Sequence, residues 1–362
     1  MDETLYRRPL PADSIAFSST EGRQVFAEAL AVGGLEGYFP LAEQFHTQSE
    51  PAYCGLGSLV VALNALAIDP GRLWKGPWRW FGEELLDCCV PLVEVRKRGL
   101  ALNELACLAR CNGADVGVVH ADTTDLAAWR EALATASRGG SVLIASYDRA
   151  VIGQTGNGHF SPIGGYHAAR DLVLVLDVAR FKYPPHWVSA ERLWQAMQSI
   201  DPVTGRTRGW MLLRPRAGIA LGFSVKCDGD SWQGLARRLT SAVADLGSAA
   251  ELAALARAVV PLIAHLELRM PTAAPHLDAL MRARAALREV PLYAQVESAV
   301  GAEHAEVVSL LLLASVDLML PEQRSTVNSL TGLLPGDSPL AAELTNLRAQ
   351  IAALWDHARD LA

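Results

Sequence analysis

The chain has 362 residues, of which 51% are hydrophobic and 20% are charged, and its formal net charge is −7. That length predicts two domains, and the hydrophobic content excludes a largely disordered chain. The acidic balance, with basic residues that form no concentrated face or run, excludes nucleic acid and a membrane surface as partners.

Targeting signals are not evident at the N-terminus. The stretch MDETLYRRPLPADS lacks the apolar segment of a signal peptide, and no apolar stretch in the sequence reaches the roughly 18–20 residues that span a bilayer. We therefore expect a cytoplasmic protein. Its cysteines should be reduced thiols, with packing, metal binding or catalysis as their roles. They are Cys54, Cys88, Cys89, Cys107, Cys111 and Cys227.

Helix and strand patterns alternate up to about residue 217, which predicts an α+β fold. Short apolar or alternating runs bounded by glycine and charge predict strands over 141–147, 158–167 and 171–181. After residue 228 the segments have helical period and are rich in Ala, Leu, Glu and Arg. We therefore predict a domain over 1–220, with an antiparallel sheet and a helical N-terminal part, and an all-α domain over 221–362. The helices expected in the second domain cover 230–247, 248–270, 274–290, 302–320 and 339–360.

The segment QSEPAYCGLGSLVVALNAL, residues 48–66, predicts a loop that becomes a buried helix. Leucines recur at helical spacing after Cys54, while Pro51 and two glycines mark a non-helical entry. Cys54 should therefore lie in the first turn of the helix, where the positive end of the helix dipole favours a thiolate. A packing role for this cysteine is the alternative.

A histidine and an aspartate lie in the predicted hairpin formed by 158–167 and 171–181. Directly opposed residues in an antiparallel hairpin have a constant sum of numbers. His159 and Asp177 sum to 336, which centres the turn at position 168 and places their Cβ atoms about 4.5–5.5 Å apart. A one-residue bulge would shift this register. The buried aspartate needs a partner, so the alternative is a structural His–Asp pair without chemistry.

Cysteine, histidine and aspartate in this chain order resemble the papain-type arrangement, and Gln48 occupies the position of its oxyanion-binding amide. The stretches QSEPAYCGL, LNALAIDPGRLWKGPWRWF, LLDCC, TGNGHFSPIGGY, LDVARFKYPPHWV and TGRTRGWMLL are similar to the catalytic domain of phytochelatin synthase. The similarity runs from LYRRPLP to about residue 232. It implies a papain-like domain in which Cys54 is the nucleophile, His159 the general base and Asp177 its orienting partner.

The resemblance implies a γ-glutamylcysteinyltransferase that takes its acyl group from glutathione. Cys54 would form a thioester with γ-glutamylcysteine and release glycine, and a second glutathione or a phytochelatin would accept the acyl group. No tightly bound cofactor is expected. Cd²⁺ or Zn²⁺ would activate the reaction as part of a metal–glutathione thiolate substrate. Two alternatives stay open: a peptidase that removes glycine from glutathione or its conjugates, and a metal-binding or sensing protein without catalysis.

Glutathione carries two carboxylates, so its pocket should contain basic groups. Arg180 and Arg208 are the candidates, together with Gly158 next to His159. Each arginine has a surface role as its alternative.

The remaining cysteines are candidates for a thiolate metal site. Cys107 and Cys111 lie four residues apart on a predicted helix, and Cys88 and Cys89 are adjacent in the chain. Packing is the alternative for all four. Eukaryotic members of the similar family end in a cysteine-rich region, whereas here only Cys227 follows residue 111. The helical tail is therefore expected to stabilise the catalytic domain, to pair with a second copy in a homodimer, or to adjust activation.

Overall fold

The structure is a computed structural model of the chain. It describes residues 7–216, 224–227, 251–263, 266–269, 276–332 and 338–359, together with residues 238, 241, 334 and 336. Among these residues, no helix is both long enough and apolar enough to cross a membrane.

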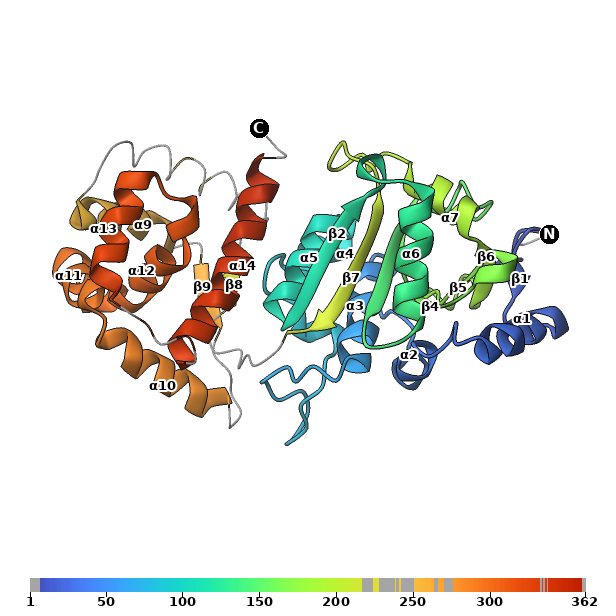
Figure 1. Cartoon of the computed structure of the whole chain (residues 1–362), viewed down its shortest axis with the longest axis horizontal. Coiled ribbons are helices and arrows are strands. Elements are labelled where there is room, and N and C mark those ends of the chain that lie inside the picture. The colour runs from blue at the N-terminus through green and yellow to red at the C-terminus, as the bar shows by residue number, and fades with distance from the viewer. Residues whose placement is uncertain are drawn as a thin grey trace.

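A seven-stranded antiparallel sheet organises the N-terminal two thirds of the chain (Figure 1). Its strand order is β1-β6-β5-β4-β3-β7-β2, so the predicted hairpin β4–β5 lies next to β3 at the centre. The mixed α+β class is thereby confirmed. The strands are β1 (Ile15–Ala16), β2 (Ala114–His120), β3 (Val142–Asp148), β4 (Gly158–His167), β5 (Leu172–Val175), β6 (His186–Ser189) and β7 (Gly209–Pro215).

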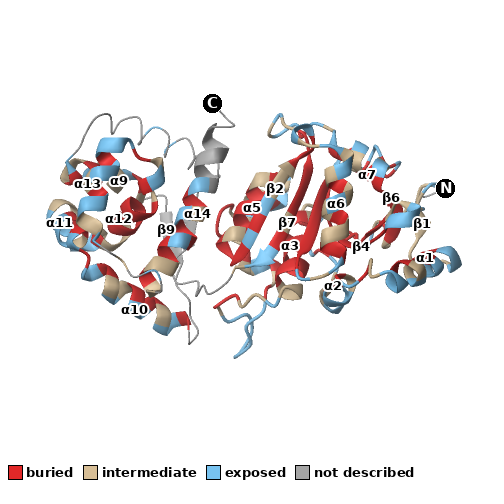
Figure 2. Ribbon diagram, in the orientation of Figure 1, coloured by how far each residue is buried: buried red, intermediate tan, exposed pale blue. Residues whose placement is uncertain are grey.

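Helices cover both faces of this sheet. The helices α3 (Cys54–Ala65) and α5 (Leu102–Cys111) pack against one face, and α6 (Leu126–Ser137) and α7 (Ala190–Met197) pack against the other. Figure 2 colours most of the central strands as buried, and the buried hydrophobic residues form two clusters, one on each face of the sheet, so the sheet is the centre of the domain. The N-terminal part also contains α1 (Thr20–Ala31), α2 (Tyr38–Gln44) and α4 (Leu92–Arg98).

Helix α3 is buried along most of its length, because residues 55–63 all lie in the core. This explains its unbroken run of small and apolar side chains, since a surface helix would show one polar face. Gly57 allows the preceding loop to approach closely: a Cβ atom there would lie 3.2 Å from Gln48 Cβ and 3.1 Å from Glu83 Oε1. The loop that leads to Cys54 therefore packs directly on the helix that Cys54 begins.

The C-terminal part is mainly helical, as predicted, but it contains an additional two-stranded ribbon. Strands β8 (Ser224–Cys227) and β9 (Leu266–Arg269) pair with each other, so the prediction of helix throughout 248–270 is wrong for its last residues. The predicted helix 230–247 lies outside the described residues apart from residues 238 and 241. The helices are α9 (Leu252–Ile263), α10 (His276–Arg288), α11 (Pro291–Val300), α12 (Ala302–Ala314), α13 (Pro321–Thr331) and α14 (Pro339–Arg359).

Helix α14 connects the C-terminal helices to the sheet domain, because it packs against α5. Leu340, Leu344 and Leu347 belong to the same hydrophobic cluster as the buried leucines of α3 and α5. The Arg216 guanidinium also donates hydrogen bonds to Asn346 and to the Ala114 carbonyl. The predicted boundary near residue 220 stays a prediction, since residues 217–223 lie outside the described part of the chain.

Candidate active site

Cys54 is the first residue of α3, and Tyr53 is its N-cap. The thiol is half-buried and lies at the wall of a cavity. Burial raises the pKa of the Cys54 thiol, but the charge of His159, a hydrogen bond from it and the Phe160 backbone N–H together lower that pKa below its ordinary value. The site therefore favours the thiolate, which is the attacking form of cysteine.

His159 and Asp177 form a hydrogen-bonded pair beside this thiol. The distance from His159 Nε2 to Asp177 Oδ1 is 2.9 Å, and both side chains are buried. Because Nε2 faces the carboxylate, Nδ1 is the ring nitrogen left for Cys54. Burial and Arg149 lower the pKa of His159, while Asp177 and Cys54 raise it by more, so the net shift is upward. The structure thus favours a thiolate–imidazolium pair.

The register between β4 and β5 differs from the one that we used to predict this pair. Residue numbers sum to 339 next to the β4–β5 turn and to 338 beyond a bulge between Ile163 and Gly165, rather than to 336. Asp177 also lies two residues past the end of β5. If the 338 register is continued, Asp177 faces Ser161 and His159 is its diagonal neighbour on the same face, within reach of a long side chain. The contact exists, but it is diagonal rather than directly opposed.

Arg149 completes the group and was missed from the sequence. Its Nη2 lies 2.7 Å from His159 Nε2, 2.9 Å from Asp177 Oδ1 and 2.7 Å from Asp177 Oδ2, and the side chain is 3% exposed. Burial raises the pKa of the Asp177 carboxyl, but His159 and Arg149 lower that pKa by more, so it lies well below its usual range. The aspartate is therefore ionised at neutral pH and serves two cationic partners.

A second layer of side chains fixes Arg149. Its guanidinium donates to the Gln154 amide oxygen, and the Gln154 amide nitrogen lies 3.0 Å from His186 Nε2. The other ring nitrogen of His186 lies 3.0 Å from the Pro184 carbonyl oxygen. No signal in a single sequence marks Arg149 as part of the site, because it follows β3 and reaches the other residues only after the sheet has folded.

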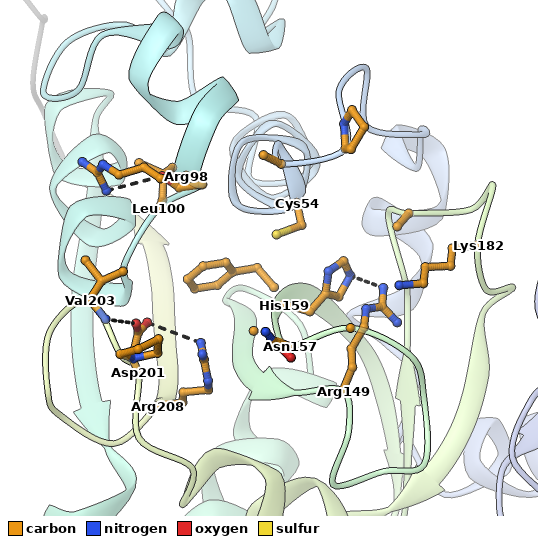
Figure 3. Close-up of a pocket in the computed structure, with 18 of the residues that line it drawn as sticks. Cys54, Arg98, Leu100, Arg149, Asn157, His159, Lys182, Asp201, Val203 and Arg208 are labelled. Carbon is orange, nitrogen blue, oxygen red and sulfur yellow. Dashed lines mark hydrogen bonds and ion pairs between the residues drawn. The ribbon is translucent and has the colours of Figure 1, made fainter.

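The cavity beside Cys54 has a volume of about 440 Å³, and its lining is strongly cationic (Figure 3). Cys54, His159 and Phe160 form part of the wall, and among the described residues Asp201 is the one acidic residue that lines it. Burial and the charge of Arg149 lower the pKa of Lys182, as expected where cations crowd together. A ligand with carboxylates would relieve this repulsion. The basic residues in the lining are Lys97, Arg98, Arg149, Lys182 and Arg208.

Two of the three predicted substrate residues line this cavity. Arg208 is buried, with Nη1 3.3 Å from Asp201 Oδ2, and it lies across the start of β4 at Gly158. A Cβ atom at Gly158 would come within 2.3 Å of Arg208 Nη1, so only glycine leaves room for the guanidinium there. By contrast, Arg180 is exposed and lies over the Phe45 ring, outside the cavity lining. Lys182 lines the cavity instead.

The Gln48 side chain is buried in the loop that precedes α3. Its Nε2 donates to the Glu50 and Pro51 carbonyl oxygens at 2.8 and 2.9 Å, and it does not line the cavity. In this arrangement both amide hydrogens hold the loop together. An oxyanion role for Gln48 stays a prediction, and it requires that one of these hydrogens turn toward Cys54.

The four candidate metal cysteines lie together, away from the cavity. Cys88, Cys89 and Cys111 have sulfur atoms within 4.8 Å of one another, and Cys107 Sγ is 3.0 Å from Cys89 Sγ. All four are buried free thiols. The structure therefore separates one half-buried thiol at the cavity from four fully buried thiols beneath α14.

An α+β fold with a cysteine at a helix N-terminus, facing a histidine on a central strand and an aspartate just past the neighbouring strand, defines the papain-like class of proteins. The phytochelatin synthase family model matches residues 5–210. The chain belongs to the phytochelatin synthase family.

Three curated relatives show how far this similarity extends. Glutathione gamma-glutamylcysteinyltransferase 1 of Arabidopsis thaliana is 51% identical over 248 residues, which are 68% of this chain and 51% of that protein. The corresponding enzyme 3 of Lotus japonicus is 50% identical over 242 residues, 66% of this chain and 50% of the relative. In Schizosaccharomyces pombe, glutathione gamma-glutamylcysteinyltransferase is 41% identical over 255 residues, 70% and 61% of the two chains. The chain thus spans about half the length of the plant relatives it matches.

Proposed function

We propose that the protein is a glutathione γ-glutamylcysteinyltransferase that works through a thioester on Cys54. The observation that carries this proposal is that Cys54 and His159 both line a cationic cavity, with Asp177 hydrogen-bonded to His159 behind it. The names of the relatives supply the substrate, since glutathione has the two carboxylates that such a cavity would bind.

Acylation follows from the placement of the thiol and imidazole. The Cys54 thiolate attacks the carbonyl carbon of the Cys–Gly peptide bond, and the imidazolium of His159 gives its proton to the leaving glycine nitrogen. The carbon–nitrogen bond breaks, free glycine departs, and γ-glutamylcysteine remains bound to Cys54 as a thioester. In this proposal the Cys54 backbone N–H at the start of α3 donates to the oxyanion of this step.

Transfer reverses the direction of proton movement. His159, now neutral, takes a proton from the α-amine of a second glutathione or of a phytochelatin, and the amine attacks the thioester carbonyl. A new peptide bond forms and the Cys54 thiolate is restored. In our proposal Cd²⁺ or a similar ion enters this step as part of a metal–glutathione thiolate acceptor. If water takes the place of the amine, the same site produces γ-glutamylcysteine and acts as a peptidase.

Arg149 tunes the acid strength of His159 in this scheme. Its charge opposes protonation of the imidazole, while Asp177 favours it, so the imidazolium forms but remains acidic enough to release its proton. Arg149 also lowers the pKa of Cys54. We therefore assign Arg149 as a positioning residue that acts through His159 and Asp177 and also lines the cavity.

The compartment and the oligomeric state belong to the same proposal. Five free thiols in the described part of the chain favour a reducing compartment such as the cytoplasm. A homodimer built through the C-terminal helices is consistent with this scheme and is tested by light scattering of the purified chain at several concentrations.

Incubation of the purified chain with glutathione, with and without Cd²⁺, tests the proposal when free glycine and thiol products are followed by mass spectrometry. We expect glycine together with γ-Glu-Cys oligomers that end in glycine, more abundant with metal. Glycine with γ-glutamylcysteine alone would show that water is the acceptor. If no glycine appears in either condition, the enzyme assignment is wrong and a metal-binding role is favoured. Cys54→Ser is the control and should release no glycine.

A further inference from the structure

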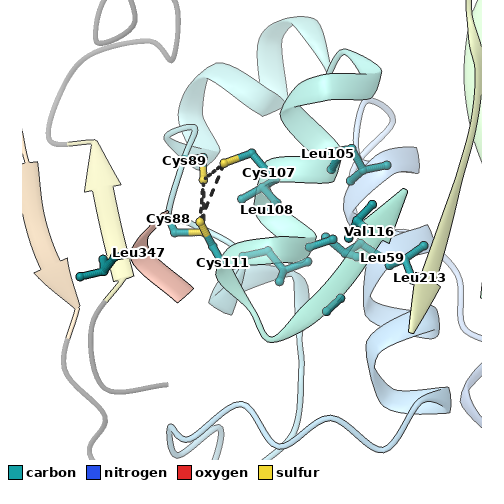
Figure 4. Close-up of a cluster of buried hydrophobic side chains, with 14 of the residues drawn as sticks. Leu59, Cys88, Cys89, Leu105, Cys107, Leu108, Cys111, Val116, Leu213 and Leu347 are labelled. Atoms are coloured by element: carbon teal, nitrogen blue, oxygen red, sulfur yellow. Dashed lines mark hydrogen bonds between the residues drawn. The ribbon is translucent and has the colours of Figure 1, made fainter. Parts of the chain in front are cut away.

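Four cysteine side chains meet at one point beneath helix α14, outside the catalytic cavity (Figure 4). Cys89 Sγ lies 3.7 Å from Cys88 Sγ, 3.0 Å from Cys107 Sγ and 3.1 Å from Cys111 Sγ, and Cys107 Sγ lies 3.9 Å from Cys111 Sγ. These are free thiols, at most 3% exposed. The chain thus concentrates four soft ligand atoms in a space with almost no solvent.

Two elements bring these thiols together. Cys107 and Cys111 lie one turn apart on α5, so their side chains project from the same face. Cys88 and Cys89 come from the bend that precedes α4 and reach the same face of α5. Thiolates in tetrahedral coordination at about 2.3 Å from Zn²⁺ stand about 3.8 Å apart. The sulfur–sulfur distances of 3.7 and 3.9 Å match this tetrahedral spacing. The two shorter distances, from Cys89 Sγ to Cys107 Sγ and to Cys111 Sγ, need to widen by about 0.7–0.8 Å.

One polar side chain next to the cluster already donates to a sulfur atom. Asn112 Nδ2 donates to Cys88 Sγ at 3.6 Å, as hydrogen-bond donors around metal-bound sulfur do. Four thiolates around a divalent ion leave a net double negative charge, so a donor at this position would stabilise the loaded site.

Helix α14 covers this cluster of cysteines. Cys111 Sγ lies 3.3 Å from Gln350 Oε1, and Leu347 packs in the same buried cluster (Figure 4). An amide offers an oxygen and an NH₂ group at similar reach, so Gln350 can accept from a thiol or donate to a thiolate. Since the site is closed, an ion enters before α14 docks or when it undocks. Binding of an ion at the four cysteines and docking of α14 against α5 should therefore favour each other.

We propose that Cys88, Cys89, Cys107 and Cys111 bind one thiophilic divalent ion of the Zn²⁺ and Cd²⁺ type, and that the bound ion stabilises the docking of α14. This site is separate from the metal that would accompany glutathione in the catalytic cavity. It does not depend on which acceptor the enzyme uses.

Metal analysis of the full-length chain tests the site directly. After loading with Zn²⁺ or Cd²⁺ and removal of excess by a weak chelator, we expect one equivalent of metal and an X-ray absorption spectrum with four sulfur ligands. Separate Zn²⁺ and Cd²⁺ samples show which ion is held. Nitrogen or oxygen ligands, no retained ion, or cluster thiols oxidised to disulfides in protein purified under reducing conditions would each overturn the proposal.

Matched variants separate the four cysteines from the nucleophile. Cys89→Ser and Cys107→Ser should lose the tightly held equivalent, whereas Cys54→Ser removes a thiol outside the cluster and should keep it. Circular dichroism checks that each variant is folded. The wild-type absorption spectrum keeps the test decisive if a cluster variant fails to fold. Retention of the ion by both folded cluster variants would contradict the assignment.

Coupling to α14 is tested by hydrogen exchange and by metal release. The amides of Pro339–Arg359 should exchange more slowly in the loaded chain than in the metal-free chain. Leu347→Ala loosens α14 above the site and should speed transfer of the ion to a chelator by about tenfold or more. Leu133→Ala, a buried leucine of α6 on the other face of the sheet, is the matched control and should not change the rate. Equal exchange with and without metal would overturn the coupling.

Discussion

Arg149 Nη2 lies 2.7 Å from His159 Nε2, so a permanent cation touches the imidazole on the side opposite the nucleophile. Asp177 bonds to both of these side chains and remains ionised between them. The imidazole is therefore held between one charge that favours its protonation and one that opposes it. The balance between the two sets the pH range in which the thiolate and the imidazolium exist together.

Replacing Arg149 should move the pH profile of the enzyme upward. Arg149 lowers the pKa of both Cys54 and His159, so Arg149→Gln raises both. The acidic limb of kcat/KM, which reports formation of the thiolate, and the basic limb, which reports loss of the imidazolium, should both shift to higher pH. Glycine release measured across a pH series gives both limbs. An unshifted profile in a folded variant would remove Arg149 from the tuning of this pair.

Asp177→Asn should reduce both stability and turnover, because the aspartate also neutralises buried Arg149. Removing one partner of a buried ion pair costs about 3–5 kcal/mol. The double variant Asp177→Asn/Arg149→Gln should recover part of this loss, with a coupling free energy of about 1–3 kcal/mol in denaturant unfolding. Turnover should not recover, since His159 stays without its carboxylate. Additive losses of stability would show that the two charges do not interact.

The same carboxylate should make stability depend on pH. The pKa of Asp177 is lowered in the folded chain, so the unfolded chain binds a proton first as the pH falls. The contribution of Asp177 to the free energy of unfolding is complete at neutral pH. It is lost as the pH falls below the pKa of about 3.9 in the unfolded chain toward the lower pKa in the folded chain. Thermal unfolding at several acidic pH values should therefore show a smaller gap between wild type and Asp177→Asn at the lowest pH. A constant gap would contradict the lowered pKa.

Gln48→Ala tests whether the loop amide also serves the oxyanion. If Gln48 turns toward Cys54 during acylation, kcat should fall by about 10²–10³ with little change in KM. Gln48 also holds the loop through Glu50 and Pro51, so a modest drop in melting temperature is expected in addition. A drop in melting temperature with unchanged kcat would limit Gln48 to shaping the loop.

Arg208 and Gly158 should act together in glutathione binding. Arg208→Ala removes a buried cation from the cavity wall and should raise KM by about 10–100-fold, as expected for a lost charged hydrogen bond. Gly158→Ala should have a similar effect, because its Cβ would displace the same guanidinium.

Arg180→Ala compares the substrate-binding role predicted from the sequence with the position of Arg180 in the structure. It should leave KM unchanged, because Arg180 lies over Phe45, and an equal rise in KM would restore its predicted role.

Local pattern was sufficient for the elements that carry Cys54 and His159, whereas the strand predicted over 171–181 ends at Val175 and leaves Asp177 outside it. The glycine and proline before an apolar run placed Cys54 at the first turn of α3, and the strand predicted over 158–167 coincides with β4. These features depend on neighbours in the chain, which a single sequence contains. The resemblance to the family also rested on continuous words of sequence. In the described C-terminal part, helical periodicity failed where strand β9 follows α9, and the helix predicted over 302–320 ends at Ala314.

Long-range packing decided what the pattern could not. A bulge in β4 changed the hairpin register and made the His159–Asp177 contact diagonal, and β3 brought Arg149 to both residues from outside the hairpin. Arg180 and Lys182 differ by two positions, yet only Lys182 lines the cavity. The helix start at Cys54 and the central strand of His159 could be predicted from the sequence, because both follow from local backbone preference. Which charges meet and which thiols share a buried space follow from the packing of distant elements, so these contacts could be identified only in the folded chain.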